Sequence, residues 1–336
     1  MPGSDVRHKS GKQRTKASTD GEGTGSSTTL GIKQTNAPVN PSERVGCDDD
    51  TQPILISDLA KFGPATRMRV GVLTDVGRVR EKNEDNALTM RANGLFVVAD
   101  GMGGHNSGEV ASKLAVDSVR AFYEHDATDS MLRGAFRAYR ERSGKGHNHR
   151  AFDEFRLWKA LEAANLHIFN TARQHEQFRD MGTTIVAVHF VGARVYIGHV
   201  GDSRVYRIRN GQLKQLTDDH SLANEYVKMK ILRKEDLPRF PYKNVIVRAL
   251  GLQESVQIDT FYREAKSGDQ FLLCSDGLTD LVEDEDILKI VLAADSPTTA
   301  CEQLVAEAND RGGVDNITAL VVEVGQIVLK SDRRKK

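Results

Sequence analysis

The 336-residue chain is poor in cysteine and has no long apolar run. Its three cysteines, Cys47, Cys274 and Cys301, show neither metal-ligand nor redox spacing. No run approaches the roughly 20 apolar residues that a membrane-spanning helix needs. The N-terminus also lacks the apolar stretch of a signal peptide. We therefore predict a protein without a membrane span, located in the reducing cytoplasm.

Net charge is also absent, because 47 basic residues balance 47 acidic ones. Nucleic-acid and membrane-surface binders usually carry a basic excess, so both classes are disfavoured. Aromatic residues are missing before Phe62, and the first 60 residues are rich in Ser, Thr, Gly, Lys and Asp. Such a segment buries too little apolar area to offset its ordering entropy. We predict a disordered leader over residues 1–60 and a basic C-terminal tail over residues 326–336.

Residues 66–325 predict one continuous α+β domain. Strand-like runs lie at 70–74, 86–90, 94–99, 183–190, 194–200, 203–209, 211–215, 261–264, 270–274 and 317–324. Helices are expected over 108–125, 155–175 and 298–310. The polar, Gly-containing stretch 143–154 predicts an exposed loop. Antiparallel-type strands with paired helices indicate two stacked sheets flanked by helices.

Short acidic motifs recur along this domain. They read Arg80-Glu-Lys-Asn-Glu-Asp85, Asp100-Gly-Met-Gly-Gly-His105, Cys274-Ser-Asp-Gly277 and Gly312-Gly-Val-Asp-Asn316. In two of them an apolar run ends in Asp-Gly, at Asp100 and at Asp276. A buried strand that ends in a carboxylate delivers it to the rim of the sheet, and the glycine lets backbone or ligand approach closely.

Carboxylates gathered at one rim repel one another unless a cation holds them. Mg²⁺ and Mn²⁺ prefer oxygen ligands, and no set of His and Cys competes here. Each Asp-Gly alone fits a simple turn, but the recurrence favours a metal site. Two neighbouring ions would activate a water near neutral pH and neutralise an anionic substrate. Arg80 is then a candidate phosphate ligand, although its local sequence also fits a surface arginine.

Together these motifs resemble those of the metal-dependent protein phosphatases, the PPM or type 2C-like serine/threonine phosphatases, in their bacterial form. Further matches in family order are Met181-Gly-Thr-Thr184, Gly198-His-Val-Gly-Asp-Ser-Arg204, Thr217-Asp-Asp-His-Ser221, Val247-Arg-Ala-Leu-Gly251 and Asp315-Asn-Ile-Thr318. The resemblance covers residues 66–325. It implies a β-sandwich of two antiparallel sheets flanked by pairs of helices, in α-β-β-α layers.

The resemblance also implies a ligand set for two Mn²⁺ or Mg²⁺ ions. Asp100 would bridge both ions, and the Gly101 carbonyl would bind one of them. Asp276 and Asp315 would hold the first ion. Glu84 would support the second.

Other roles are implied outside that set. Asp85 would orient the attacking water, Arg80 would hold phosphate, and Asp180 is the candidate ligand of a weaker third ion. Animal-type members carry a histidine directly after Asp-Gly that protonates the leaving group, whereas this chain has Met102. His105 need not replace it, so the identity of the general acid stays open.

Some matched positions favour a structural interpretation. Glycines in Gly182–Thr184 and Gly201–Ser203 permit close strand packing, and Asp202 would satisfy turn amides or an arginine. The segment 222–244 resembles the mobile flap beside the cleft of the family, where a charged, Pro-containing lid would influence substrate choice.

The implied function is a metal-dependent protein serine/threonine phosphatase in which activated water attacks phosphorus directly. Its partners would be phosphorylated proteins and a cognate serine/threonine kinase. Nothing in the chain suggests an obligate oligomer, so we expect a monomer. The alternative is a catalytically inactive module of the same fold that binds phosphoproteins. Such a module would be expected to lose metal-site acids, and all of them stand here.

Overall fold

The computed structural model describes residues 66–104, 107–142, 150–242 and 244–327. Of the two compact units into which the chain divides, 1–44 and 45–336, all the described residues belong to the second. The predicted leader lies outside them. So do most of the 143–154 loop and the basic tail beyond residue 327.

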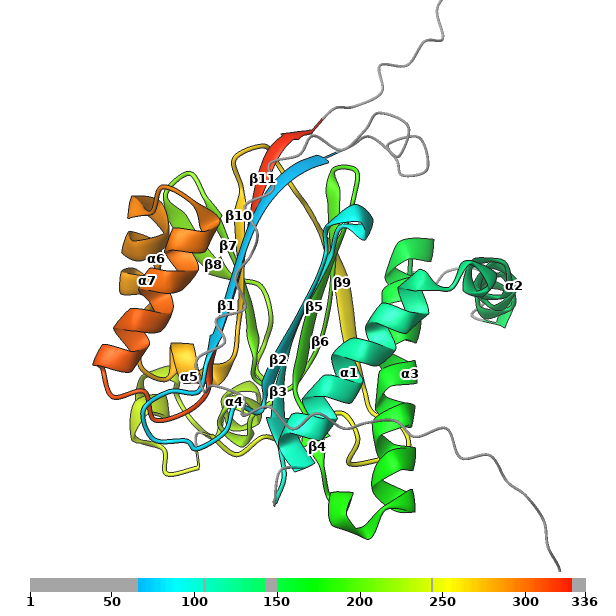
Figure 1. Cartoon of the computed structure of the whole chain (residues 1–336), viewed down its shortest axis with the longest axis horizontal. Coiled ribbons are helices and arrows are strands. Elements are labelled where there is room, and N and C mark those ends of the chain that lie inside the picture. Colours follow the sequence, from blue (N-terminus) through cyan, green and yellow to red (C-terminus); the bar gives the residue numbers. More distant parts are fainter. Residues whose placement is uncertain (1–65, 105–106, 143–149, 243, 328–336) are drawn as a thin grey trace, which may run out of the picture. The chain divides into compact units, whose positions relative to one another are not determined.

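Two antiparallel sheets form the centre of this unit (Figure 1). The first has the strand order β1-β11-β10-β7-β8, and the second has β2-β3-β5-β6-β9 with β4 paired to β3. The strands are β1 Thr66–Asp75, β2 Asp85–Met90, β3 Leu95–Met102, β4 Gly182–Thr183, β5 Ile185–Val191, β6 Arg194–Val200, β7 Arg204–Arg209, β8 Gln212–Gln215, β9 Asp259–Glu264, β10 Gln270–Cys274 and β11 Ile317–Ile327.

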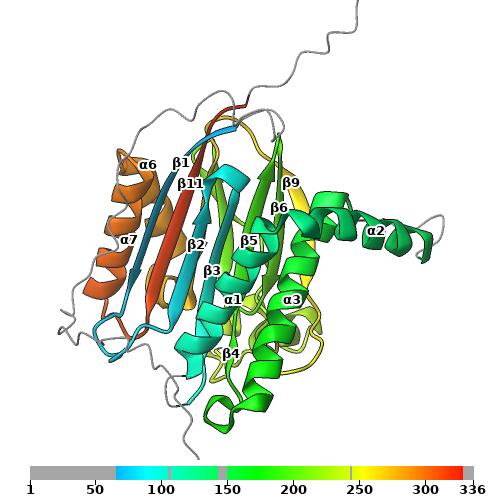
Figure 2. The ribbon, with the colours of Figure 1, turned by 45° about the vertical axis from the view of Figure 1, so that its right-hand side comes forward.

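Helices cover both outer faces of the sandwich. The α-helices of the described residues are α1 Ser107–Glu124, α2 Asp126–Arg142, α3 Phe152–Gln174, α4 Leu222–Lys228, α5 Asp276–Thr279, α6 Asp284–Ala293 and α7 Pro297–Asp310. The pair α1 and α3 lies on the second sheet, and the pair α6 and α7 lies on the first (Figures 1 and 2). This arrangement confirms the predicted α-β-β-α sandwich.

Three apolar layers hold the sandwich together, and β3 shows how. Leu95, Val97 and Ala99 pack against the helices, whereas Phe96 and Val98 pack between the sheets. Both faces of this strand are therefore covered, which explains why its sequence is continuously apolar rather than alternating. Cys274 and Cys301 are buried as small core residues.

Strand direction brings the acidic motifs to one end of the sandwich. Strands β3 and β10 end there, and β2 and β11 begin there, because Asp85 pairs with Asp100 and Cys274 pairs with Ala319. This end carries α4, α5 and β4 and lies at the bottom of Figure 1.

Within the described residues, the structure adds the helices α2, α4, α5 and α6 to those that the sequence predicted, and it extends α3. Helix α3 begins at Phe152, so the last residues of the predicted 143–154 loop are helical. Helix α2, which the sequence did not predict, extends away from the sandwich (Figure 2). Its Phe136 packs edge-on against Phe152 and contacts Phe155, so aromatic packing fixes both elements. Within the described ranges, no helix is both long and apolar enough to cross a membrane.

Candidate active site

Asp100 stands at the end of β3, where backbone bonds fix it. Its N–H donates to Thr184 Oγ1 at 3.2 Å, and its carbonyl accepts bonds from the Thr184 N–H and the Thr183 hydroxyl, both at 2.8 Å. These threonines contact backbone, as the structural interpretation of Gly182–Thr184 expects. The Cβ of any larger residue at Gly101 would lie 2.0 Å from the Gly108 carbonyl oxygen, so only glycine fits after Asp100.

Asp85 is buried beside Asp100, its partner across the β2–β3 ladder. Its Oδ2 accepts hydrogen bonds from the hydroxyls of Ser275 and Thr318, each at 2.7 Å. Its Oδ1 is buried without a hydrogen-bond partner among the described residues. One oxygen is thus held in place while the other stays free for a ligand or water.

Asp276 and Asp315 come from neighbouring strands of the first sheet. Asp276 opens α5, one residue after the end of β10, and its carboxyl group lies near that of Asp100. Asp315 precedes β11, and its Oδ1 accepts the N–H of Asn316 at 2.8 Å. The two sheets therefore contribute carboxylates to one shared cluster.

Asn316 ties this cluster to the loop that carries Arg80. Its side-chain oxygen accepts the Glu84 N–H at 2.8 Å, and its amide donates to the carbonyls of Val76 and Lys82 at 2.9 and 2.8 Å. Together with Ser275 and Thr318, it belongs to motifs that the sequence singled out without giving these residues a role.

Glu84 lies at the N-terminus of α1. Its carboxylate accepts the backbone N–H groups of Gly108 and Glu109, and it also gains from the positive end of the helix dipole. A Cβ at Gly108 would lie 2.7 Å from the Glu84 carboxyl carbon, so glycine is required for this approach. Burial raises the pKa of Glu84, and nearby Arg80 opposes that rise.

Asp202 is a member of the cluster that the sequence interpretation missed. The sequence interpretation expected Asp202 to satisfy turn amides or an arginine, but the nearby Arg204 binds Asp219, at 2.7 Å. Asp202 Oδ1 is buried and has no partner in the described part of the chain. Burial and the nearby Asp276 raise the pKa of Asp202 to about 8. Asp202 follows β6 and Asp276 follows β10, so the sequence alone could not show that these two acids lie close together.

Burial disfavours the charged form of the carboxyl groups Asp85, Asp100 and Asp276 in this cluster. Burial, followed by the charges of neighbouring carboxylates, raises the pKa of Asp276 to about 6 and that of Asp100 well above its ordinary range. Burial likewise raises the pKa of Asp85 to about 7, against the hydrogen bonds from two hydroxyls. An all-oxygen cluster with two buried, unpartnered carboxylate oxygens fits hard divalent cations.

The remaining predicted residues lie around this cluster. Arg80 is half-exposed and its Nη2 lies 2.8 Å from Asp315 Oδ2. Asp180 is exposed at a left-handed φ of 61° in the turn before β4, which pairs with β3 through Gly182 and Met102. No hydrogen bond given for the described residues joins Asp180 to the cluster, so its role as a third-metal ligand stays a prediction. His105 lies outside the described residues.

A family model described as protein phosphatase 2C matches residues 78–308. The chain belongs to this family. It is 36% identical over 255 residues to the serine/threonine phosphatase stp of Listeria welshimeri, across 74% of this chain and 93% of that protein. It is 34% identical over 264 residues to the protein phosphatase PhpP of Streptococcus pneumoniae, across 77% of this chain and 98% of PhpP.

Solved structures agree with this assignment. The serine/threonine phosphatase PstP/Ppp of Mycobacterium tuberculosis superimposes with a TM-score of 0.66 and 32% identity, covering 78% of this chain and all of that one. A PstP catalytic domain in complex with two manganese ions gives a TM-score of 0.64 at 31% identity, with 78% of this chain and 100% of that one covered. The predicted family and fold class are thereby confirmed.

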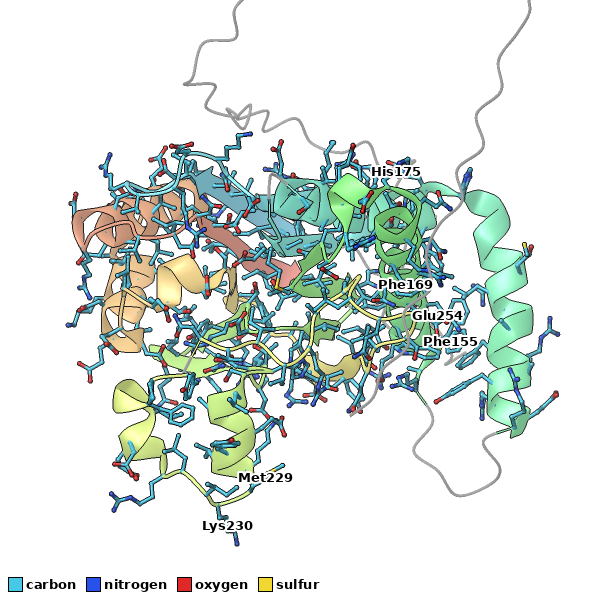
Figure 3. All side chains as sticks on the ribbon, turned by 90° about the horizontal axis from the view of Figure 1, so that it is seen from below. Phe155, Phe169, His175, Met229, Lys230 and Glu254 are labelled. Carbon is cyan, nitrogen blue, oxygen red and sulfur yellow. The ribbon has the colours of Figure 1, made fainter. Side chains whose placement is uncertain are left out.

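The segment predicted as the flap of this 2C-family domain, residues 222–244, begins with α4. Ser221 caps that helix, because its hydroxyl accepts the Asn224 N–H at 3.2 Å. Met229 and Lys230 follow the helix and mark the tip farthest from the sheets (Figure 3). Met229 is 64% exposed.

Proposed function

We propose that this chain is a metal-dependent protein serine/threonine phosphatase. The observation that carries the proposal is the convergence of acids from four strand ends, with two buried carboxylate oxygens left unpartnered. Neutral hydrogen-bond partners do not balance this charge. The family and the named activities of the relatives point to the same chemistry.

The proposed ligands follow from the placement of the oxygens. Asp100 of the second sheet lies near Asp276 of the first sheet, so it would be suited to bind both ions. The Gly101 carbonyl beside it would bind one of them. Asp276 and Asp315 would complete one site, and Glu84 would support the other. When bound, Mn²⁺ or Mg²⁺ supplies an activated water and neutralises the phosphate charge.

The protein groups around these ligands orient the reaction. Asp85 presents its free Oδ1 while Ser275 and Thr318 hold its Oδ2, so it is suited to fix the direction of the attacking water. Arg80 presents a half-exposed guanidinium that can form paired hydrogen bonds to a phosphate. Met102 has no acidic proton, so the leaving group must be protonated by another group.

The proposed substrates are phosphoserine and phosphothreonine side chains of proteins modified by a serine/threonine kinase. The exposed tip of the flap, which carries Met229 and Lys230 away from the sheets, supports a protein substrate rather than an enclosed small molecule (Figure 3). The proposed location is the cytoplasm, in keeping with a chain that is poor in cysteine. We propose that the protein acts as a monomer.

The test is hydrolysis of an aryl phosphate and of a phosphothreonine peptide, with Mn²⁺, with Mg²⁺ and with EDTA. We expect turnover with either ion, none with EDTA and none by the Asp276→Asn variant. If the folded protein turns over neither substrate with either ion yet binds the phosphopeptide, the inactive binding module replaces this proposal.

A further inference from the structure

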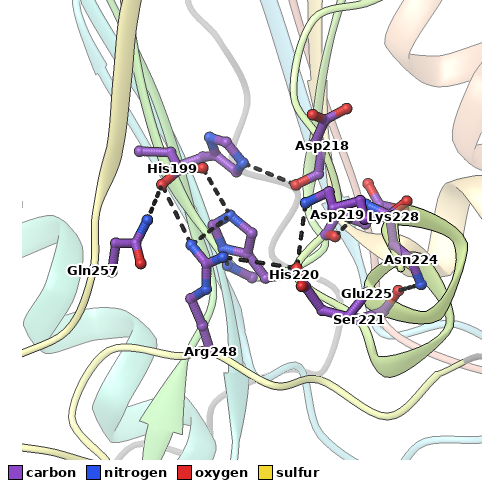
Figure 4. Close-up of polar contacts among 12 residues, drawn as sticks. His199, Asp218, Asp219, His220, Ser221, Asn224, Glu225, Lys228, Arg248 and Gln257 are labelled. Atoms are coloured by element: carbon purple, nitrogen blue, oxygen red, sulfur yellow. Dashed lines mark hydrogen bonds and ion pairs between the residues drawn. The ribbon is translucent and has the colours of Figure 1, made fainter. Parts of the chain in front are cut away.

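Two buried histidines, His199 and His220, lie together with Arg248 (Figure 4), and the partly exposed Asp259 completes this polar cluster. His199 belongs to β6, His220 precedes α4, and Asp259 begins β9. The two imidazole rings stack with their centroids 4.6 Å apart, and His220 is completely buried. One ligand atom of each histidine and one of Asp259 lie within 4.8 Å of one another, which is the spacing of a metal site.

Hydrogen bonding argues against a metal in this cluster. The Gly201 N–H donates to His220 Nδ1 at 3.1 Å, so that nitrogen carries a lone pair and Nε2 carries the proton. That Nε2–H points to Asp259 Oδ2 at 3.3 Å. The Arg248 guanidinium lies 3.2 Å from the same nitrogen and bonds Asp259 Oδ1 at 3.3 Å. A metal would have to remove the proton and displace a cation.

The same histidine fixes the turn that leads into the acidic cleft. Besides the ring contact, the His220 N–H donates to the Gly201 carbonyl at 2.9 Å, so two hydrogen bonds join these residues. Gly201 has a φ of +107° and lies against Thr184, which leaves it little freedom to move. The next residue is Asp202, whose buried and unpartnered Oδ1 belongs to the acidic cluster.

His220 also lies where both ends of the flap meet. Its carbonyl accepts the Val247 N–H at 2.8 Å, after the flap. At the start of the flap, the Leu222 N–H donates to the Val245 carbonyl at 2.8 Å, and Ser221 forms a bridge with Ile246. The base of the flap is therefore closed by backbone bonds that begin at His220.

Arg248 extends the connection to the flap helix. Its Nη1 bonds Asp259 on the sheet, and its Nη2 lies 3.8 Å from Glu225 Oε1 in the first turn of α4. The hydrogen bond from His220 is the main cause that lowers the pKa of Asp259, to about 2, so Asp259 is a permanent anion here. The flap helix, the flap base and the sheet edge thus share one polar network.

We propose that His220 is a positioning residue that couples the flap to the Asp202 side of the cleft. A displacement of the flap base moves the His220 ring, and the ring is the acceptor that holds the Gly201–Asp202 turn. Metal binding in the cleft and ordering of the flap are then linked. Each must favour the other by the same factor. This inference rests on the proposed function for the identity of the cleft ligand.

Two substitutions at His220 separate its two contacts. The oxygen of His220→Asn reaches about as far as Nδ1, so it keeps an acceptor for the Gly201 N–H but loses Asp259. The amide of His220→Gln reaches about as far as Nε2, so it keeps Asp259 but loses the acceptor. Both remove the same ring, so a purely space-filling role would give the two variants the same properties.

The experiment is Mn²⁺ titration by calorimetry and hydrogen exchange of residues 222–248, both without substrate. In the wild type, Mn²⁺ should slow exchange across the flap base. His220→Gln should weaken Mn²⁺ binding about fivefold or more, within the usual range of coupling between sites. His220→Asn keeps the acceptor for the Gly201 N–H, so it should keep the Mn²⁺ affinity within about twofold and also keep the response of flap exchange to Mn²⁺.

Arg248→Ala and His189→Asn serve as further comparisons. Arg248→Ala leaves the buried ring intact and should reduce the Mn²⁺ response of the flap, so it tests the network even if the His220 variants fold poorly. His189 is a buried histidine of β5 that contacts Tyr123, outside this network. His189→Asn should lower stability without changing the Mn²⁺ response.

The coupling is overturned if the two His220 variants bind Mn²⁺ equally, or if Mn²⁺ leaves wild-type flap exchange unchanged. Neither readout involves phosphate hydrolysis. A protein without phosphatase activity that still shows the coupling would refute the proposed function alone. An active phosphatase without the coupling would refute this inference alone.

Discussion

Two sets of buried carboxylates in this sandwich are treated in opposite ways. At the end of the sandwich remote from the acidic cleft, Asp269 is 1% exposed, and its carboxylate is paired with a cation and hydrogen-bonded. It accepts bonds from Arg209 Nε at 2.6 Å and from the Lys266 N–H at 2.7 Å. In the cleft, Asp85 and Asp202 each keep a buried oxygen with no partner that the structure describes. The same side chain thus stabilises the fold in one place and opposes it in the other.

The difference shows where the fold gives up stability for binding. An uncompensated buried charge is unfavourable unless a ligand neutralises it. Here the neighbouring acids raise one another's pKa. Arg204 only partly opposes that rise at Asp276 and Asp202, because its guanidinium is bonded to Asp219, and Arg80 pairs with Asp315 at the margin. A site that is unfavourable when empty gains most from a divalent cation, which is the state in which we propose that it functions.

The largest contrast should come from removing one charge in each set. Asp100→Asn should lower kcat/KM at least about 1,000-fold, without lowering the free energy of unfolding of the metal-free protein. Asp269→Asn should lower that free energy by about 3 kcal/mol, because Arg209 loses its partner, while the folded protein keeps its activity. Urea denaturation and peptide hydrolysis measure the two effects. Equal losses of activity in both variants would remove the distinction.

The next effect is a pH dependence of the metal-free protein. The pKa values of Asp276, Asp85 and Asp202 are raised to about 6, 7 and 8 in the folded state. The folded state therefore holds protons that the unfolded chain releases at lower pH. The stabilisation from these protons is complete below about pH 4 and is lost as pH rises through these values.

Denaturation at pH 5 and pH 8 measures this loss. In EDTA, the free energy of unfolding should be lower at pH 8, and Asp202→Asn should reduce the difference by on the order of 1 kcal/mol. Saturating Mn²⁺ should remove most of it, because the ions replace the protons as partners of the carboxylates. A pH dependence that is identical in EDTA and in Mn²⁺ would contradict the electrostatic contrast between the two sets.

A smaller effect is expected at the margin of the cleft, where Arg80 pairs with Asp315. Arg80→Ala should lower kcat/KM about 10- to 100-fold, the equivalent of one charged hydrogen bond to phosphate. The same variant should bind Mn²⁺ up to about fivefold more tightly, because a half-exposed ion pair no longer competes for Asp315. Calorimetry without substrate checks this, with Arg80→Lys as the control that keeps the charge. Weaker Mn²⁺ binding by Arg80→Ala would argue against the competition.

The acids of the cleft could be predicted because a short sequence pattern around each of them indicates its position in the fold. An apolar run that ends in Asp-Gly indicates both a buried strand and a carboxylate at its end, and this holds for Asp100 and for Asp276. Antiparallel pairing then brings the ends together without further information. The predicted strands lie within a few residues of those in the structure for the same reason.

Other features depend on contacts that no local pattern contains. Helix α2 has few apolar residues, and its Phe136 packs against Phe155 of another helix, a contact that the local sequence does not indicate. Asp202 resembled a turn residue until the fold placed it beside Asp276, 74 residues later in the chain. The role of His220 depends on which of its nitrogens faces the Gly201 N–H, a fact of geometry alone.

The smallest expected effect compares two matched helix caps, one in the flap and one in the sandwich. Ser221 accepts the Asn224 N–H at the start of α4, and Ser296 accepts the Thr299 N–H at the start of α7. Ser296→Ala should lower the free energy of unfolding by about 1 kcal/mol. Ser221→Ala should change it by less than about half of that, since the flap can open without unfolding the sandwich. Instead, it should speed hydrogen exchange of α4 amides. If both variants lower the free energy of unfolding equally, the flap unfolds together with the sheets and has no independent motion to couple to the cleft.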